Sequence, residues 1–383
     1  MQTPKLLALV MAGLTMPLTA ACNGSSNSSI KEPASAVTHK VDFSRQKITQ
    51  FNEPWAMNFL PDGRLLVTER KGSLKLYDPS TKKTSNISGL PAVVYAGQGG
   101  LGDVVLHPDF VQNGLVYFSY AEAGTGGSGA AVARGKLTSD SHGDGQLSNV
   151  QVIWRQVPKV SGDGHFGHRI AFDKEGMLWI SSGERQKFDP AQDMNSNLGK
   201  IIRLHEDGSI PADNPFAKQG GVAAQIWSLG HRNPLGIAFN EQGQLWEVEM
   251  GPKGGDELNL IEKSQNYGYP LVSNGDHYDG KPIPDHHTRP EFKAPAISWS
   301  PVISPSSLMF YHGNQFPAWQ GNAFIGGLSS QALIRIEFDG NSAREAERFD
   351  MGARIRDVKQ GPNGSLWLLE DGKNANLLQL VPK

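Results

Sequence analysis

The sequence predicts an all-β protein, and two observations carry this prediction. The chain of 383 residues contains 44 glycines and 24 prolines, a composition typical of folds with many tight turns. The second observation is a repeat, in which a turn with glycine precedes a strand of large apolar residues. The pattern occurs six times, in segments 61–67, 112–118, 174–180, 241–247, 319–325 and 362–368.

The glycine turns indicate how each repeat folds. Asp62-Gly63 and Asn113-Gly114 are strong hairpin signals, because the turn before a strand requires positive φ. A four-stranded sheet takes about 40 to 50 residues, so each repeat has room for one sheet and its loops. Six sheets closed into a ring leave no exposed edges. We therefore predict a six-bladed β-propeller over residues 41–383, with a β-sandwich containing chance hairpins as the alternative.

The charge balance argues against a nucleic-acid partner. Lysine and arginine total 36 against 38 aspartates and glutamates, and the formal net charge is −2. Proteins that bind nucleic acid usually present a clustered basic face, which this chain lacks in sequence. The longest inserts lie between the third and fifth repeats, and we expect functional loops there.

The N-terminus has the features of an export signal. Lys5 precedes a short apolar segment (6–16), which is too short for a stable transmembrane helix. Small residues then lead to Cys22, the only cysteine, in an arrangement that resembles a bacterial lipobox. We predict a signal peptide (1–21), a lipidated Cys22 with a flexible tether (22–40), and a periplasmic domain that contacts the membrane only through this anchor. An ordinary secretory peptide is the alternative.

An imidazole, a guanidinium and a carboxylate lie in nearby positions of the chain. His165 and Arg169 are in a glycine-rich segment (162–169), and Glu184 ends the next strand-like run. A carboxylate fixes the tautomer of a histidine and stabilises its protonated form, which is a common arrangement for a general base. Arg232 and Asn233 follow another short strand, where it meets a proline-bounded loop. A purely structural histidine–glutamate pair is the alternative.

Two further motifs indicate ligands. Gly251-Pro252 lies in a loop with carboxylates nearby, and such a loop can turn backbone carbonyls toward Ca²⁺, which takes oxygen ligands. Arg354 and Arg356 are two residues apart and share a face if extended, as suits bidentate contacts to a carboxylate or phosphate ligand. Most glycine–proline loops bind no metal, and a solvated arginine pair is the alternative for the second motif.

Together these motifs resemble the soluble pyrroloquinoline quinone (PQQ)-dependent sugar dehydrogenases, especially the bacterial aldose sugar dehydrogenases. The resemblance runs from about residue 51 to 380 and rests on segments 97–102, 107–110, 162–169, 230–234, 251–257, 266–268, 304–306 and 354–358. The family fold is a six-bladed propeller, which agrees with the repeat count. The resemblance implies oxidation of an aldose at C1 to the lactone, with electrons passed to a quinone or other acceptor.

The resemblance also implies roles for individual residues. His165 matches the base that takes the hydroxyl proton, Glu184 its supporting carboxylate, and Arg232 the group that polarises the quinone C5 carbonyl. The groups that hold PQQ match Gln98, Arg232, Asn233, Arg354 and Arg356. The Ca²⁺ that bridges protein and cofactor matches the carbonyls of Gly251 and Pro252, a second Ca²⁺ site matches Glu257 and Tyr267, and the aromatic that lines the sugar cleft matches Trp299.

The chain departs from the family pattern at three positions. Ser329 stands where a lysine usually pairs with the cofactor, a loss worth roughly 1.5–3 kcal/mol of binding. His168 replaces a usual glycine, where it would crowd the sugar site, contact the cofactor or point to solvent. Met250 replaces a usual polar residue. A propeller that lost its cofactor and binds carbohydrate or a cell-envelope partner is therefore a second hypothesis, and a calcium-dependent lactonase or hydrolase is a third.

The loop from 276 to 290 carries three histidines, His277, His286 and His287, whose spacing fits no metal motif. We expect an exposed loop there.

Overall fold

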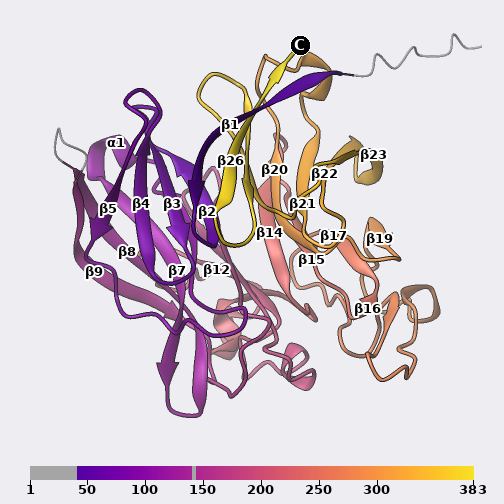
Figure 1. Ribbon diagram of the computed structural model, residues 1–383. Helices are drawn as coiled ribbons and strands as arrows, with labels where there is room; N and C mark the ends of the chain where they lie inside the picture. The colour runs from indigo at the N-terminus through magenta and orange to yellow at the C-terminus, as the bar shows by residue number, and fades with distance from the viewer. Residues whose placement is uncertain (1–40, 140–143) are drawn as a thin grey trace, which may run out of the picture. The chain divides into compact units, whose positions relative to one another are not determined.

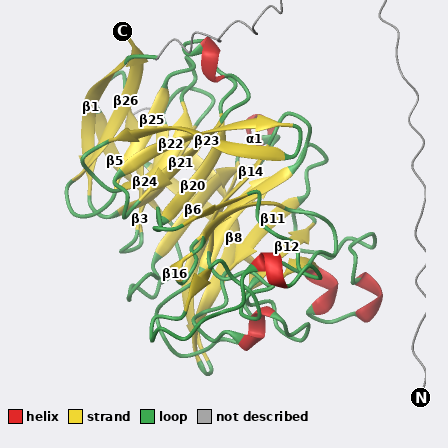
Figure 2. Cartoon of the chain, turned by 90° about the vertical axis from the view of Figure 1, so that its right-hand side faces the viewer, coloured by secondary structure: helices red, strands yellow, loops and turns green. Residues whose placement is uncertain are grey.

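The computed structural model describes residues 41–139 and 144–383, and strands dominate these residues. The predicted signal peptide, Cys22 and the tether lie outside the described residues. Within them the short helices lie among the loops (Figure 2) and comprise α1 (Phe110–Asn113), η1 (Asp189–Ala191), η2 (Ala217–Gln219), η3 (Ala223–Gln225), η4 (His286–Thr288) and η5 (Pro317–Trp319). The all-β prediction is confirmed. No helix in the described part of the chain has the length and apolar character needed to cross a bilayer.

Most strands pair with their neighbours in sequence, which gives antiparallel sheets of four strands (Figure 1). One sheet contains β10 (Gly167–Phe172), β11 (Leu178–Ser182), β12 (Lys200–Leu204) and β13 (Ile226–Leu229). The next contains β14 (Pro234–Phe239), β15 (Leu245–Glu249), β17 (Asp256–Leu260) and β19 (Ile297–Trp299). A third contains β20 (Pro305–Phe310), β21 (Ala323–Gly327), β22 (Ala332–Asp339) and β23 (Ser342–Asp350). A two-stranded ribbon pairs β16 (Lys253–Gly254) with β18 (Gly275–Asp276).

The largest sheet has eight strands and divides naturally into two halves. Its first half contains β2 (Pro54–Phe59), β3 (Leu65–Glu69), β4 (Ser73–Asp78) and β5 (Lys83–Ser88). Its second half contains β6 (Leu101–Leu106), β7 (Leu115–Gly124), β8 (Gly127–Ser139) and β9 (Gly145–Arg155). In the described residues, the strand pairing between the halves is a short parallel ladder of β5 with β9, through Ile87 opposite Gly145 and Ser88 opposite Gln146.

The remaining sheet joins the beginning of the described chain to its end. It contains β24 (Ile355–Gln360), β25 (Leu366–Glu370), β26 (Ala375–Pro382) and β1 (Phe43–Phe51). Figure 1 shows β1, in indigo, beside β26, in yellow, and their antiparallel register runs from Phe43 opposite Pro382 to Phe51 opposite Ala375. A sheet made from both ends of a chain is the usual device for closing a ring of sheets.

The six predicted glycine turns each precede the second strand of a four-stranded unit. These glycines have φ values between 67° and 88°, and they are Gly63, Gly114, Gly176, Gly243, Gly321 and Gly364. At Gly63 and Gly176 an added Cβ would meet no atom within 4 Å, so the backbone conformation, and not crowding, requires glycine there. The hairpin predicted from each repeat is therefore confirmed.

The first strand of each unit packs against the first strand of the next. β2 contacts β6, β6 contacts β10, β10 contacts β14, β14 contacts β20, β20 contacts β24, and β24 contacts β2. Each of these strands also shifts register against its hairpin partner near its start, for example between Gly167 and Ile170 in β10. Such bulges redirect side chains and are common beside active sites.

The apolar core lies between neighbouring sheets. For example, Trp246 and Val248 of β15 form one buried cluster with Leu308 of β20 and Ile325 of β21. A buried arginine, Arg169, links the first strands in addition to their apolar contacts. Its guanidinium donates to the carbonyl oxygens of residues 235, 306 and 356 and lies 3.4–3.5 Å from carboxylate oxygens of residues 103 and 357.

Candidate active site

The predicted histidine and glutamate meet in the structure. His165 precedes β10 and has a φ of 49°, and its backbone N–H donates to Gln98 Oε1 at 2.8 Å. His165 Nδ1 donates to Glu184 Oε1 at 2.5 Å, and both side chains are buried. Glu184 Oε2 accepts the backbone N–H groups of Lys187 at 2.5 Å and Phe188 at 2.7 Å. Both carboxylate oxygens are therefore satisfied, and the imidazole is held in one orientation.

The environment keeps His165 neutral and Glu184 ionised. Burial lowers the pKa of His165, the charge of Arg232 lowers it further, and the hydrogen bond to Glu184 only partly opposes this. Burial alone would raise the pKa of Glu184, but the hydrogen bond from His165 and the backbone donors outweigh it, so its pKa is lowered. With Nδ1 donating to Glu184, the lone pair of His165 is on Nε2.

Arg232 adjoins this pair. Its carbonyl oxygen accepts the backbone N–H of Glu184 at 2.9 Å, so the loops after β11 and β13 are tied together. Its Nη1 donates to the carbonyl oxygens of Met250 at 2.8 Å and Gly251 at 2.7 Å. Within residues 41–139 and 144–383, its buried Nε has no hydrogen-bond partner. A buried donor without an acceptor is costly, and a ligand atom would satisfy it.

A cavity of about 240 Å³ lies beside these residues and is lined by three of the predicted cofactor residues, Gln98, Arg354 and Arg356. Asp371 pairs with both arginines, at 2.8 Å from Arg354 Nε and 2.9 Å from Arg356 Nη2. The prediction that the two arginines share a face is therefore confirmed. Arg70 also lines the cavity, so three guanidiniums face one carboxylate there.

Trp55 and His168 also line the cavity, and the sequence singled out only His168. The two rings stack with centroids 4.9 Å apart, and His168 Nδ1 lies 2.8 Å from Ser119 Oγ. His168 is 2% exposed, so the expectation that it could point to solvent is wrong. Burial lowers its pKa to about 3, which makes it a neutral ring. Gly102 permits this packing, because a Cβ there would lie 2.0 Å from the His168 ring.

Asn233 and Met250 lie at the edge of the same region. Asn233 is fully buried, and its Oδ1 accepts the backbone N–H of Gly167 at 3.2 Å, so its side chain supports the start of β10. Met250 lines the cavity, and its Sδ lies 4.0 Å from Asn233 Nδ2. The apolar Met250 side chain therefore occupies the position where the sequence comparison expected a polar group.

The Gly251-Pro252 loop has a defined internal support in Asp256. The carboxylate of Asp256 accepts the backbone N–H of Gly251 at 2.9 Å and those of Ile303 and Ser304 at 2.8 and 2.6 Å. Burial raises the pKa of Asp256 to about 6. Gly251 must be glycine here, because an added Cβ would lie 2.3 Å from the carbonyl oxygen of Gly254.

Glu257 and Tyr267, the predicted second metal site, are both buried. Glu257 Oε1 lies 3.2 Å from His286 Nε2, which is 5% exposed, so the expectation of an exposed loop is wrong for His286. The Tyr267 hydroxyl donates to the Leu260 carbonyl at 2.5 Å and accepts the Glu262 N–H. Since that hydroxyl is committed, only the backbone carbonyl of Tyr267 remains for a metal.

Of the predicted site residues, only Gln98, Arg354 and Arg356 line the cavity itself. Trp299 and Ser329 lie away from it. Trp299 is 6% exposed in the core cluster between the β14–β19 and β20–β23 sheets, and its Nε1 donates to Glu345 at 2.7 Å. We therefore correct its assignment to the sugar cleft, because its indole packs between sheets. Ser329 is exposed, and its Oγ accepts a hydrogen bond from Ser304 Oγ at 2.8 Å, while its neighbour Leu328 lines the cavity.

Sequence reasoning missed an aromatic group around Arg232. The guanidinium carbon lies 5.8 Å from the Tyr269 ring and 5.9 Å from the Tyr278 ring. Phe188, which is 43% exposed, stacks on Tyr269 with centroids 6.3 Å apart. Exposed aromatic rings next to a polar cavity are typical of sugar sites. The available signal was the Asn-Tyr-Gly-Tyr-Pro segment, of which only Tyr267 was selected.

The donors and charges suit an anionic, planar cofactor. Three arginines against one aspartate leave the cavity positively charged, and paired guanidiniums bind carboxylates in a bidentate manner. The unpartnered Arg232 Nε adds a buried donor in the same region. These observations fit PQQ, which is a tricarboxylate, better than they fit a neutral ligand.

Comparison with known proteins agrees with this arrangement. The family model for Glucose / Sorbosone dehydrogenase matches residues 51–379. An aldose sugar dehydrogenase of Escherichia coli is 40% identical over 359 residues, covering 91% of this chain and 95% of that protein. Its solved apo form has a TM-score of 0.84 at 39% identity, covering 89% and 100% of the two chains. The PQQ-bound aldose sugar dehydrogenase of Streptomyces coelicolor has a TM-score of 0.74 at 26% identity, covering 90% and 99%.

Proposed function

Because the chain belongs to the Glucose / Sorbosone dehydrogenase family, we propose that it oxidises an aldose at C1 to the lactone in a PQQ- and Ca²⁺-dependent reaction. The predicted family and the predicted class of enzyme, a sugar dehydrogenase, are confirmed by these relatives. When bound, PQQ supplies the two-electron acceptor for the hydride from C1. The observation that carries the proposal is the His165–Glu184 pair beside a cavity lined by arginines.

His165 acts as the general base. Its Nε2 lone pair takes the proton of the C1 hydroxyl as the C1–H bond breaks and the C1=O bond of the lactone forms. The lowered pKa of His165 keeps the ring unprotonated at neutral pH, and the carboxylate of Glu184 then stabilises the imidazolium. General-base catalysis of this kind contributes roughly 10²–10⁴ to the rate.

The arginines bind the cofactor and orient it. Arg354 and Arg356 would bind carboxylates of PQQ. Gln98 and Asn233 position the backbone at His165 and at the start of β10. Arg232 places its unpartnered Nε beside the His165–Glu184 pair, where a donor would stabilise an oxyanion. One well-placed donor of this kind is worth about 2.7–4 kcal/mol in the transition state. The exposed rings of Phe188 and Tyr278 offer apolar faces to a sugar.

Two Ca²⁺ ions complete the proposal. The carbonyls of Gly251 and Pro252 would hold the ion that contacts the cofactor, although Arg232 Nη1 already donates to the Gly251 carbonyl. Glu257 and the backbone carbonyl of Tyr267 would hold the second. Oxygen donors from carbonyls and a carboxylate are the ligands that Ca²⁺ prefers.

The wider assignments follow from the strand order and the N-terminus. We propose that the eight-stranded sheet is two blades, because only two residue pairs join its halves, which makes six blades in a ring. We propose export to the periplasm as a lipoprotein anchored at Cys22, with a quinone or other carrier as the electron acceptor. The motif that supports export is the signal-like segment 1–21.

A second candidate function is a cofactor-less propeller that binds a carbohydrate or a cell-envelope partner. One observation favours it, because Asp371 neutralises part of the charge on Arg354 and Arg356, and no lysine stands at Ser329. A calcium-dependent lactonase would share the fold and would act without PQQ.

Titration of the purified protein with PQQ in the presence of Ca²⁺, followed by dye reduction with a panel of aldoses, tests the proposal. Saturable PQQ binding with aldose-dependent dye reduction is the expected result. Carbohydrate binding without any PQQ binding would favour the second candidate, and hydrolysis of lactones without PQQ would favour the third.

A further inference from the structure

A buried group of acidic side chains lies on the β14–β19 sheet, outside the cavity just described. Glu247 and Glu249 are two residues apart on β15 and so point to one face. On β17, Asn259 lies opposite Glu247, and Glu257 lies opposite Glu249. Each of the four side chains is at most 6% exposed. Three carboxylates therefore share one buried face with a single amide.

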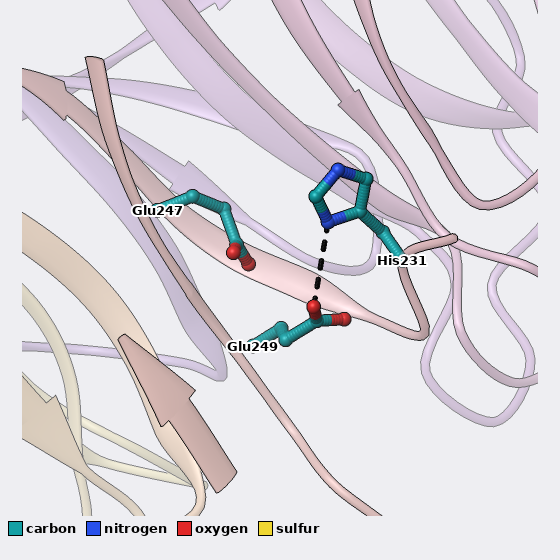
Figure 3. A group of neighbouring side chains, drawn as sticks. All are labelled: His231, Glu247 and Glu249. Carbon is teal, nitrogen blue, oxygen red and sulfur yellow. Dashed lines mark hydrogen bonds and ion pairs between the residues drawn. The ribbon is translucent and has the colours of Figure 1, made fainter. Parts of the chain in front are cut away.

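His231 adds an imidazole to this group. It lies in the loop between β13 and β14, and Figure 3 shows its ring turned toward the carboxylates of Glu247 and Glu249. One ligand atom from each of these three residues lies within 4.8 Å of the others. Its Nε2 lies 2.8 Å from Ser228 Oγ, and its Nδ1 lies 3.4 Å from Glu249 Oε1. The Tyr267 ring stacks on it with centroids 4.6 Å apart.

The negative charge of the group is not balanced by the protein. In residues 41–139 and 144–383, Glu249 and Glu257 form ion pairs only with histidines, and Glu247 forms none. Asn259 Nδ2 has two hydrogens, yet three carboxylates lie 3.1–3.4 Å from it. Glu249 Oε2 also accepts the backbone N–H groups of Arg232 at 2.5 Å and Asn233 at 3.2 Å, so the shortage of donors lies at Glu247. A buried carboxylate without a cation or sufficient donors is strongly unfavourable, so a positive charge or a proton must enter the group beside Glu247.

Two buried polar atoms point to a missing partner. Within the described residues, Glu247 Oε1 and Asn259 Oδ1 have no hydrogen-bond partner, and both side chains are 0% exposed. Glu247 belongs to the set of three whose ligand atoms converge, so one oxygen of its carboxylate lies within 4.8 Å of ligand atoms of His231 and Glu249. An unpaired carboxylate oxygen next to an imidazole nitrogen and a second carboxylate is a donor set for a metal ion.

We propose that His231, Glu247 and Glu249 bind a divalent transition-metal ion of the Zn²⁺ or Mn²⁺ type. A nitrogen ligand favours these ions over Ca²⁺, which prefers oxygen ligands throughout. The contact from Ser228 to Nε2 orients the imidazole so that Nδ1 faces the carboxylates, as outer partners of metal-bound histidines commonly do. The site adjoins the Glu257–Tyr267 pair but uses other ligand atoms, and it does not depend on PQQ.

The competing state is a proton in place of the metal. Burial, with the neighbouring charge of Glu249, raises the pKa of Glu247 well above its usual range. A metal-free protein would then carry a protonated Glu247. Because no ligand side chain is exposed, we expect the ion to enter as the chain folds.

The test is refolding of the chelator-treated protein with Zn²⁺, Mn²⁺ or Ca²⁺ alone, followed by metal analysis and thermal unfolding. We expect one Zn²⁺ or Mn²⁺ per chain and a rise in Tm of several degrees in the wild type. Glu247→Gln should lose that ion and the rise in Tm. Glu345→Gln, which changes a carboxylate on β23 that pairs with Arg348 outside this group, is the control and should keep both.

Electron paramagnetic resonance of the Mn²⁺-loaded wild type gives a second readout that needs no variant. Coupling to one imidazole nitrogen is expected, and it would support the site even if Glu247→Gln failed to fold. Binding of Ca²⁺ alone, absence of any bound Zn²⁺ or Mn²⁺, or retention of the ion by a folded Glu247→Gln variant would each overturn the proposal.

Discussion

Two histidine–glutamate pairs in this protein look alike but differ in their balance of donors and acceptors. In the first, Glu184 Oε1 accepts the N–H of the His165 ring and Oε2 accepts two backbone N–H groups, so both carboxylate oxygens have donors. In the second, His231 Nδ1 lies 3.4 Å from Glu249 Oε1, and Glu249 Oε2 likewise accepts two backbone N–H groups, but this pair adjoins Glu247, whose Oε1 has no partner among the described residues.

The difference shows what each pair can do. A satisfied carboxylate holds its histidine in one tautomer and leaves the other ring nitrogen for chemistry at the cavity. A buried group of carboxylates with too few hydrogen-bond donors needs an added positive charge to be stable. The first pair is therefore suited to moving a proton, and the second to holding a cation.

The largest expected effect comes from removing the imidazole of the first pair. His165→Ala should lower kcat for aldose oxidation by about 10²–10⁴, because the hydroxyl proton loses its acceptor. Steady-state dye reduction at saturating PQQ gives kcat, and fluorescence titration gives PQQ affinity, which should change little. A kcat near that of the wild type would show that another group serves as the base.

Leucine in place of Glu184, in the first pair, and of Glu247, beside the second pair, should have different effects on stability. Glu184→Leu removes the partner of His165 and leaves two backbone N–H groups without their acceptor, and it should lower the free energy of unfolding by about 3–5 kcal/mol. Glu247→Leu, measured without metal, should leave it unchanged or raise it by about 1–3 kcal/mol, because an unpaired buried carboxylate is lost. Denaturant unfolding measures both, and similar losses in the two variants would remove the distinction.

His168 extends the comparison to a histidine that has no carboxylate partner among residues 41–139 and 144–383 and contacts Ser119 instead. Its folded pKa is about 3, below the ordinary value of 6.5, so the unfolded chain binds more protons between these values. Stability is then fully present above pH 6.5 and is lost as the pH falls toward 3. Between pH 6.5 and 5 the wild type should lose about 2 kcal/mol more than His168→Asn.

Denaturant unfolding of both proteins at these two pH values gives the difference. Asparagine tolerates the φ of 60° at this position, so the variant should fold. Equal losses in the wild type and the variant would mean that His168 is protonated or exposed in the folded state.

The smallest effect concerns the arginine side of the cavity. Ser329→Lys adds an exposed positive charge beside Leu328, and we expect PQQ affinity to rise by up to about tenfold, or 1.4 kcal/mol. Ser329→Gln, which lengthens the side chain without adding charge, is the control. A similar gain in both variants would assign the effect to size and not to charge.

The repeat was predictable because its signal is local. Glycines such as Gly63 and Gly364 are needed for positive φ whatever the rest of the chain does, and the apolar strand that follows is a local pattern too. His165 and Glu184 were predictable for a similar reason, since a short loop and one strand bring them together. The two-residue spacing of Arg354 and Arg356 predicted that their side chains share one face of the strand.

Which side chains line the 240 Å³ cavity was not fully predictable, because register shifts in the first strands decide which residues face it. His168 lies within the shift between Gly167 and Ile170, and Trp55 within the one between Pro54 and Ala56. A simple alternation of faces fails at such bulges. Trp299 was misplaced because aromatic residues near a cleft and between sheets look the same in sequence.

Single-turnover reduction of bound PQQ by an aldose carrying deuterium at C1 tests the central claim most directly. The account predicts a rate several-fold slower than with the protium sugar in the wild type, and almost no reduction with either sugar in His165→Ala. Reduction at the same rate in His165→Ala and the wild type would contradict the role of the His165–Glu184 pair.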